Sequence, residues 1–136
     1  MRTDKKIQLE KKRHWRVRRK VIGTKDRPRM SVAFTNQHIY VQFIDDAAGM
    51  TLAAASTRSK PVPDQAKLAA NVASAKVIGQ RAAEAALARQ IKHVVFDRGG
   101  ARYHWSKCKG KDGKPVVVRG KLAELADAAR AAGLKF

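Results

Sequence analysis

Apolar and polar side chains alternate with a period of two soon after the first basic stretch of the chain. Met30, Val32 and Phe34 are separated by polar or small residues, and this alternation is typical of a half-buried strand. Two further apolar runs follow, each after a short polar turn, so that the three runs lie at residues 29–34, 39–44 and 50–56. Because both turns are short, the sequence predicts an antiparallel meander of three strands.

Apolar spacings of three and four residues predict two helices in the second half of the chain. Two prolines break the chain before the first helix, which begins between Asp64 and Asn71. Its apolar face, small enough to approach a sheet closely, consists of Leu68, Val72, Ala75, Gly79, Ala82 and Ala86. The second helix runs from about residue 121 to 132, with Gly133 as its C′ residue. Its inner face is formed by Leu122, Leu125, Ala126 and Ala129.

Two short segments complete the predicted fold. Residues 93–96 form an apolar run between the helices and predict a buried strand. Residues 105–119 contain a Gly-Lys-Asp-Gly-Lys turn sequence followed by three valines, which predicts a projecting β-hairpin. The order βββαβα predicts an α/β fold whose mixed sheet has three antiparallel strands plus a fourth and packs against two helices.

Charge is concentrated at one end of this 136-residue chain. The net charge is +19, and residues 1–29 hold 13 Lys and Arg but only 3 acidic residues. Hydrophobic residues make up 44% of the sequence, enough for a real core. We therefore divide the chain into a basic arm at 1–28 and a compact α/β domain at 29–136, which includes the hairpin at 105–119. A polyanion is the expected partner.

The arm is a candidate helix with Thr3 as a possible N-cap. It has no convincing apolar stripe, and its crowded arginines repel one another, so we expect it to become ordered against phosphates. A solvated tail that aids solubility is the alternative, but the density of Arg favours RNA, because guanidinium groups bind phosphates and stack on bases. Trp15 either stacks on a base or pins the arm to the body, and the sequence leaves this open.

Several classes of protein are disfavoured. The chain has no apolar run of membrane-spanning length and no signal-peptide pattern, and its single Cys108 has no disulfide partner within the chain. It is expected to be soluble and cytoplasmic. The carboxylates to test for two-metal nuclease chemistry are Asp45, Asp46 and Asp97, but their positions favour turns and local pairing with bases. We expect no enzyme activity, cofactor or metal site. A general RNA-binding or chaperone-like protein remains the alternative function.

Candidate RNA-binding residues come from the arm and from loops of the body, where cations, amides and aromatic rings suit structured RNA. In the arm and just after it they are Arg2, Lys5, Lys6, Lys11, Lys12, Arg13, His14, Trp15, Arg16, Arg18, Arg19, Lys20, Arg27 and Arg29. In the body they are Asn36, His38, Tyr40, Arg58, Lys60, Arg98, Arg102, Tyr103 and His104. Tyr40 is equally well explained as a half-buried strand residue. Gly99-Gly100 predicts a tight turn, one that approaches RNA closely.

Several blocks resemble one family, and they occur in the same order along nearly the whole chain. They are Arg27-Pro28-Arg29, His38-Ile39-Tyr40-Val41-Gln42, Ala54-Ala55-Ser56-Thr57, Val94-Val95-Phe96-Asp97-Arg98-Gly99-Gly100 and Leu125-Ala126-Asp127-Ala128-Ala129-Arg130. The sequence resembles the eighteenth protein of the large ribosomal subunit, bacterial type. This resemblance implies a structural protein that binds 5S rRNA and helps attach it to the large-subunit rRNA in the central protuberance. It implies neighbouring ribosomal proteins as partners, and neither a membrane nor a homo-oligomer.

The sequence departs from that family in two places. Trp15 stands where the family's arm is usually basic, and residues 105–119 interrupt a connection that normally runs directly into the last helix. This insertion carries five basic residues and one acid. We expect it to contact ribosomal RNA or an adjacent protein, with an unpartnered surface loop as the alternative.

Overall fold

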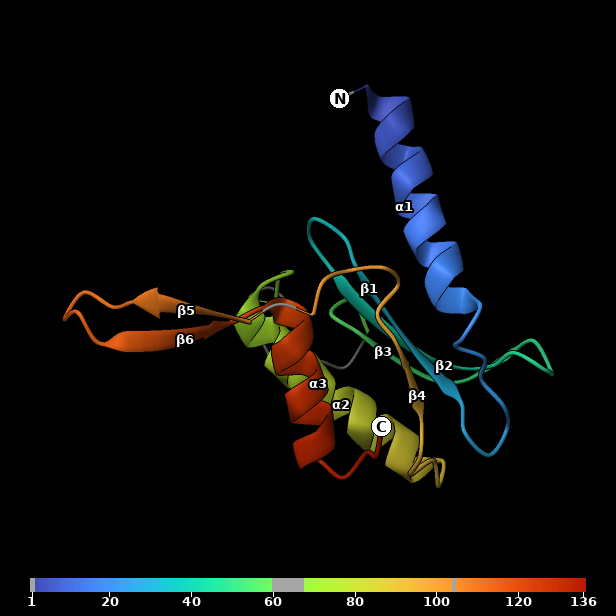
Figure 1. Ribbon diagram of the computed structural model, residues 1–136. Coiled ribbons are helices and arrows are strands. Elements are labelled where there is room, and N and C mark those ends of the chain that lie inside the picture. Colours follow the sequence, from blue (N-terminus) through green and yellow to red (C-terminus); the bar gives the residue numbers. More distant parts are fainter. Residues whose placement is uncertain (1, 60–67, 104) are drawn as a thin grey trace.

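The computed structural model describes residues 2–59, 68–103 and 105–136. Its elements run in the order α1 (Thr3–Arg18), β1 (Arg29–Phe34), β2 (Ile39–Asp45), β3 (Met50–Ser56), α2 (Val72–Ala88), β4 (Val95–Asp97), β5 (Trp105–Lys109), β6 (Pro115–Arg119) and α3 (Lys121–Ala131). The predicted α/β class is confirmed, and the arm and the insertion add a helix and a separate two-stranded sheet to it (Figure 1).

The main sheet has the strand order β3-β2-β1-β4. The predicted meander is confirmed, because β1 and β3 both pair with β2 in antiparallel orientation, with Met30 opposite Phe43 and Val32 opposite Val41. β4 pairs with β1 in parallel, which makes the sheet mixed. Alternate side chains of a strand lie on the same face of a sheet. On the face toward the helices, Met30, Ile39 and Phe43 are fully buried.

The fourth strand begins two residues later than predicted. His93 forms an isolated bridge with Lys135, and the Val94 N–H donates to the Lys135 carbonyl at 3.0 Å. The C-terminal segment therefore takes the pairing that residues 93 and 94 were expected to make with the sheet. Val94 is fully buried, whereas Val95 and Phe96 are half-buried because β4 is an edge strand.

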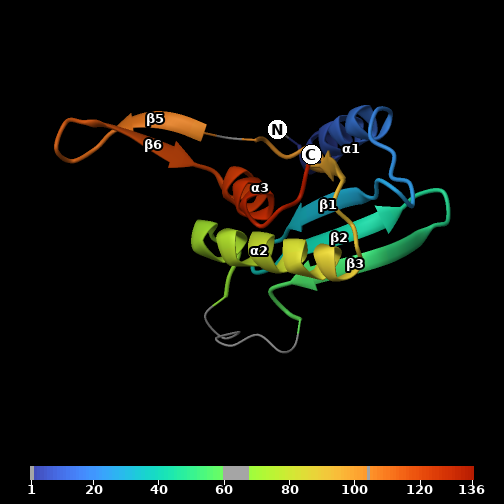
Figure 2. The ribbon, with the colours of Figure 1, turned by 90° about the horizontal axis from the view of Figure 1, so that it is seen from below.

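Both helices of the body lie on one side of the sheet, where α2 packs against β2 and β3 and α3 packs against α2 (Figure 2). The core contains Met30, Phe43 and Ile78, with Leu125 from α3. A Cβ atom on Gly79 of α2 would lie 2.5 Å from the Leu125 carbonyl oxygen. This small residue therefore permits close approach of the two helices to each other, rather than of a helix to the sheet as predicted.

The boundaries of both helices follow from local capping. Asn71 is the N-cap of α2, and its side-chain oxygen accepts from the Ser74 N–H at 2.7 Å. Leu68 therefore precedes the helix and Val72 is exposed, so the predicted apolar face is correct only from Ala75 onward. The predicted inner face of α3 is confirmed. At its C-terminus Gly133, with φ +111°, is the C′ residue of a Schellman motif, as expected from its conformational freedom.

Candidate nucleic-acid interface

The helix α1 is basic on every side and contributes nothing to the core. None of its residues is buried, and residues 2–20 contain ten Lys and Arg against two acids. Thr3 is not the N-cap, because its backbone is already helical and Arg2 occupies the cap position without a capping side chain. In Figure 1 the helix extends away from the sheet, and its C-terminal half lies nearer to the body. Its surface is thus available to a partner along most of its length.

Trp15 belongs to this exposed surface. Its exposed fraction is 65%, so it does not pin the arm to the body. A shallow hollow on the helix is lined by Trp15 together with Lys12, Arg16 and Arg19. These cations lie within about one helical turn of the indole ring. The arrangement of a flat aromatic face beside several cations suits a nucleotide base and its phosphates.

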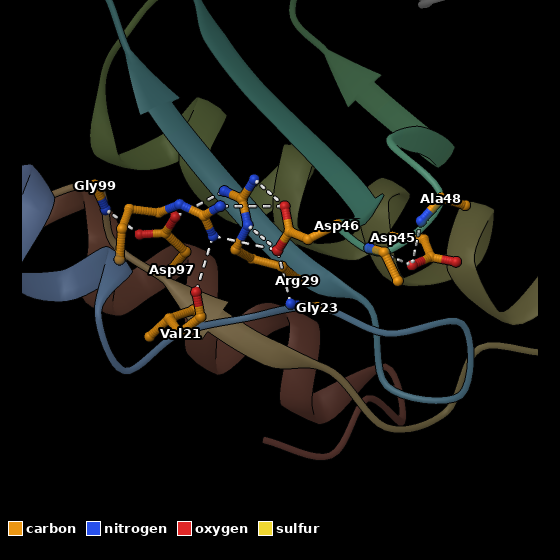
Figure 3. Close-up of polar contacts among 10 residues, drawn as sticks. Val21, Gly23, Arg29, Asp45, Asp46, Ala48, Asp97 and Gly99 are labelled. Carbon is orange, nitrogen blue, oxygen red and sulfur yellow. Dashed lines mark hydrogen bonds and ion pairs between the residues drawn. The ribbon is translucent and has the colours of Figure 1, made fainter.

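One carboxylate fixes α1 to the body. Asp46 accepts from both terminal nitrogens of Arg18 at 3.2 Å, and its Oδ2 accepts from the Gly23 N–H at 2.7 Å. A Cβ atom on Gly23 would lie 2.3 Å from the Ile44 carbonyl oxygen, so only glycine fits here. Arg18 also donates to the Val21 carbonyl at 2.8 Å. Figure 3 shows that these groups converge where the linker after α1 crosses the end of β2.

Arg29 completes this junction from within the sheet. Its guanidinium donates to Asp46 at 3.0 Å through two nitrogens and to Asp97 at 2.8 Å through the third. The hydrogen bonds from Arg29 hold the pKa of Asp46 well below its usual range, and the hydrogen bond to Asp46 raises the pKa of Arg29. Arg29 is only 8% exposed. It is therefore removed from the predicted RNA-binding set, since both carboxylates already hold its charge.

The three acidic residues tested as nuclease candidates have structural partners. Asp45 accepts from the N–H groups of Ala47 and Ala48, an Asx-type turn, as predicted. Asp97 pairs with Arg29 and accepts from the Gly99 N–H at 2.8 Å. Within the described ranges, no three His, Cys, Asp or Glu side chains are placed to hold a metal ion. No helix there is long and apolar enough to cross a membrane.

The loop after β4 packs against the arm. Gly99 and Gly100 have φ values of +59° and +81°, which confirms the tight turn. A Cβ atom on Gly100 would lie 3.2 Å from Cβ of Arg13 and 3.4 Å from N of His14. The close approach expected toward RNA is thus made to the backbone of α1. The exposed Arg98 and Arg102 consequently lie beside the basic helix and extend its surface.

The predicted contacts at the first β-turn form a second group, on another part of the body. Asn36 is exposed. His38 is half-buried, with its Nδ1 atom 3.0 Å from Oγ1 of Thr57 and its ring 6.2 Å from that of Tyr40 in edge-to-face geometry. Tyr40 is half-buried in β2, as in its alternative explanation. The buried Thr57, which also accepts from the Ile39 N–H, positions this group and was missed from the sequence.

The remaining predicted residues lie at scattered positions. Arg58 is exposed after β3. Arg27 donates to the Val94 carbonyl at 3.3 Å, and the 39%-exposed Tyr103 accepts from Arg130 at 3.3 Å. Lys60 and His104 lie outside the described residues. The structure thus brings the arm together with Arg98 and Arg102.

Comparison with known proteins identifies the family. The profile of the family described as ribosomal L18 of archaea, bacteria, mitochondria and chloroplast matches residues 4–109. The chain belongs to the ribosomal L18 family. This match runs from the start of α1 to the end of β5, so it includes both the basic arm and the meander. Membership makes the chain a ribosomal protein, a structural component rather than an enzyme.

Curated members of the L18 family match nearly the whole chain. A large ribosomal subunit protein uL18 from Caldanaerobacter subterraneus is 50% identical over 129 residues, covering 95% of this chain and 93% of the relative. The uL18 proteins of Dictyoglomus thermophilum and Lactobacillus delbrueckii are 45% and 47% identical, and each alignment covers at least 93% of both chains. These relatives confirm the predicted resemblance.

Proposed function

We propose that this constituent of the large ribosomal subunit binds 5S rRNA and helps attach it to the large-subunit rRNA in the central protuberance. Family membership supports the ribosomal setting, and the basic arm supports RNA as the partner. Neighbouring ribosomal proteins of the central protuberance are the further partners in this proposal. The RNA-binding residues are those predicted from the sequence, with Arg29 removed.

The observation that carries the proposal is the state of α1. A helix of 16 residues that buries none of its side chains gains little stability from its own chain. Its like charges repel one another, and a polyanion relieves that repulsion. The Arg18–Asp46 pair and the Gly100 contact hold the helix at a fixed place on the body. The arm therefore presents its cations to RNA from a defined position rather than as a solvated tail.

The residues of α1 bind RNA in two ways, by charge and by stacking. Lysines and arginines along α1 neutralise phosphates and release counterions, which supplies affinity without reading sequence. Trp15 stacks on an unpaired base between those phosphate contacts. Selectivity for one RNA then comes from shape, because the arm and the loop at Arg98 and Arg102 must both reach the RNA at once.

The test compares two RNAs and two sets of basic residues. The full chain is titrated with 5S rRNA and with an unrelated RNA of equal length. An arm variant replaces Lys5, Lys6, Lys11 and Lys12 with Gln, and a control variant replaces the exposed Lys76, Arg89, Lys92 and Lys135 with Gln. The two variants lose the same charge.

We expect tighter binding of 5S rRNA, and a salt dependence that weakens in the arm variant only. Four lost phosphate contacts reduce the slope of log affinity against log salt by about 3. Equal affinity for both RNAs at physiological salt would overturn the specificity for 5S rRNA. Equal slopes for the arm and control variants would overturn the role of α1.

A further inference from the structure

The β5–β6 hairpin belongs neither to the packed core nor to the basic arm, and its role is not accounted for by either. It projects from the body in a different direction from α1, as both views show (Figures 1 and 2). All five residues of β6 are exposed, and no strand of the main sheet pairs with the hairpin. An isolated hairpin is marginally stable in water. Its projection therefore calls for a partner.

The base and the tip of the hairpin are built to hold its direction. Arg119, the last residue of β6, forms an ion pair with Asp127 of α3, and Gly120 is the N-cap of that helix. At the tip, the Gly110 N–H donates to the Lys114 carbonyl at 2.9 Å, and Gly113 has a φ of +70°. The hairpin thus leads directly into α3, and its direction relative to that helix is held by the contacts at its base.

The pairing register separates the side chains of the two strands into unlike faces. Lys107 lies opposite Val117, and Lys109 lies opposite Pro115 on the same face. The other face carries Cys108 opposite Val116, with Val118 beside them. The turn adds Lys111 and Lys114, with Asp112 as the single acid of the insertion. Between the Arg119–Asp127 ion pair and the tip of the hairpin, the exposed charge is therefore almost entirely positive.

These lysines form no ion pair within the part of the chain that the structure describes. No carboxylate there pairs with Lys107, Lys109, Lys111 or Lys114, and all four are exposed. The apolar surface is less continuous, because Val117 points to one face while Val116 and Val118 point to the other, each about half exposed. A specific protein–protein interface buries at least about 1,000 Å² around an apolar centre. A polyanion needs only the row of cations.

We propose that the β5–β6 hairpin is a second RNA-binding surface, which contacts the phosphate backbone of an RNA segment distinct from the one that α1 binds. Alternate residues of a strand are about 7 Å apart, so Lys107 and Lys109 reach successive phosphates along one edge. The two lysines of the turn extend this row outward. The contact is sequence-independent, and it strengthens the hold of the protein on the assembled subunit.

The experiment uses large subunits from the source organism that have been stripped of this protein. The full chain is rebound to them across a range of salt concentrations. A hairpin variant replaces Lys107, Lys109, Lys111 and Lys114 with Gln, and a rescue variant replaces the same four with Arg. The control variant of Lys76, Arg89, Lys92 and Lys135 loses the same charge elsewhere. Isolated 5S rRNA binding is measured for each, so that failure of the proposed function is seen separately.

We expect the hairpin variant to lower the salt slope of subunit binding by about 3, while its binding to isolated 5S rRNA stays within twofold of the parent chain. The arginine variant should restore the parent slope, which shows that charge rather than fold was lost. A photoreactive residue at Val117 should crosslink to RNA. A hairpin slope equal to that of the control variant overturns the proposal. Crosslinks to protein alone would replace RNA with a protein partner and overturn it equally.

Discussion

Replacing Asp46 with Asn tests whether one carboxylate joins the arm to the body. The side chain keeps its size and still accepts from the Gly23 N–H, but it loses the charge that Arg18 and Arg29 both contact. Hydrogen bonds to charged groups contribute about 1.5–3 kcal/mol each. The side chain of Arg18 is 31% exposed, so its ion pair with Asp46 contributes little to stability. The buried Arg29 contributes more, because in the variant Asp97 is the one charged partner that it retains. We expect a loss of about 2–4 kcal/mol in the free energy of unfolding.

Urea unfolding followed by circular dichroism measures this loss. With a slope of about 1–3 kcal/mol per molar urea, the midpoint should fall by roughly 1–2 M. Asp26→Asn is the matched control, because Asp26 is exposed and lies in the linker after α1 that Asp46 contacts through Gly23. A loss below about 0.5 kcal/mol, the range of an ordinary surface substitution, would refute the idea that Asp46 is the anchor.

The pH dependence gives a second reading of the same site. Because the folded state lowers the pKa of Asp46 from its ordinary value of 3.8, the unfolded chain binds the proton more readily. The stabilisation is therefore complete above about pH 4 and declines as pH falls toward the lowered pKa. The difference in stability between the parent chain and Asp46→Asn should shrink below about pH 4. A difference that stays constant as pH falls from 4 to 2 would contradict this assignment.

Two further substitutions test the core and the arm. Gly79→Ala places a methyl group 2.5 Å from the Leu125 carbonyl, so we expect a loss of about 1–3 kcal/mol from overpacking, measured by thermal unfolding. An unchanged midpoint would mean that α2 and α3 shift apart freely. Trp15→Ala should weaken binding of 5S rRNA by about 1–3 kcal/mol without changing the salt slope, whereas Trp15→Phe should retain part of the affinity. Equal affinities for both variants would show that no base stacks there.

Most of the fold can be predicted because strand alternation and helical spacing depend only on residues that are close in the sequence. Alternation in residues 29–34 and the apolar spacing after Lys121 depend on which side chains face the core, and both are confirmed. The start of the fourth strand was predicted wrongly because His93 pairs with Lys135, about forty residues later in the chain, instead of with the main sheet. Leu68 fits the helical spacing, but the helix begins only after its N-cap at Asn71, three residues later.

The candidate site was predicted less completely, because its anchor is a long-range contact. Asp46 was correctly placed at a turn, but nothing nearby in the sequence indicates that Arg18 is its partner. Arg29 looked like any other cation of the arm, and only the fold shows that it faces inward toward Asp97. Gly100 was identified as a turn residue, while its neighbour, the backbone of α1, follows only from the tertiary arrangement.

The anchor at Arg18 also determines the direction in which α1 forms. A helix pays its entropic cost in the first turn and then grows by one hydrogen bond per residue. The contacts at Arg18 and at Gly100 both restrain the C-terminal half of α1, and none restrains the turn at Thr3. Nucleation therefore belongs to the end nearest the sheet, and growth proceeds toward the N-terminus. Amide hydrogen exchange along α1 should accordingly quicken from residue 18 toward residue 3.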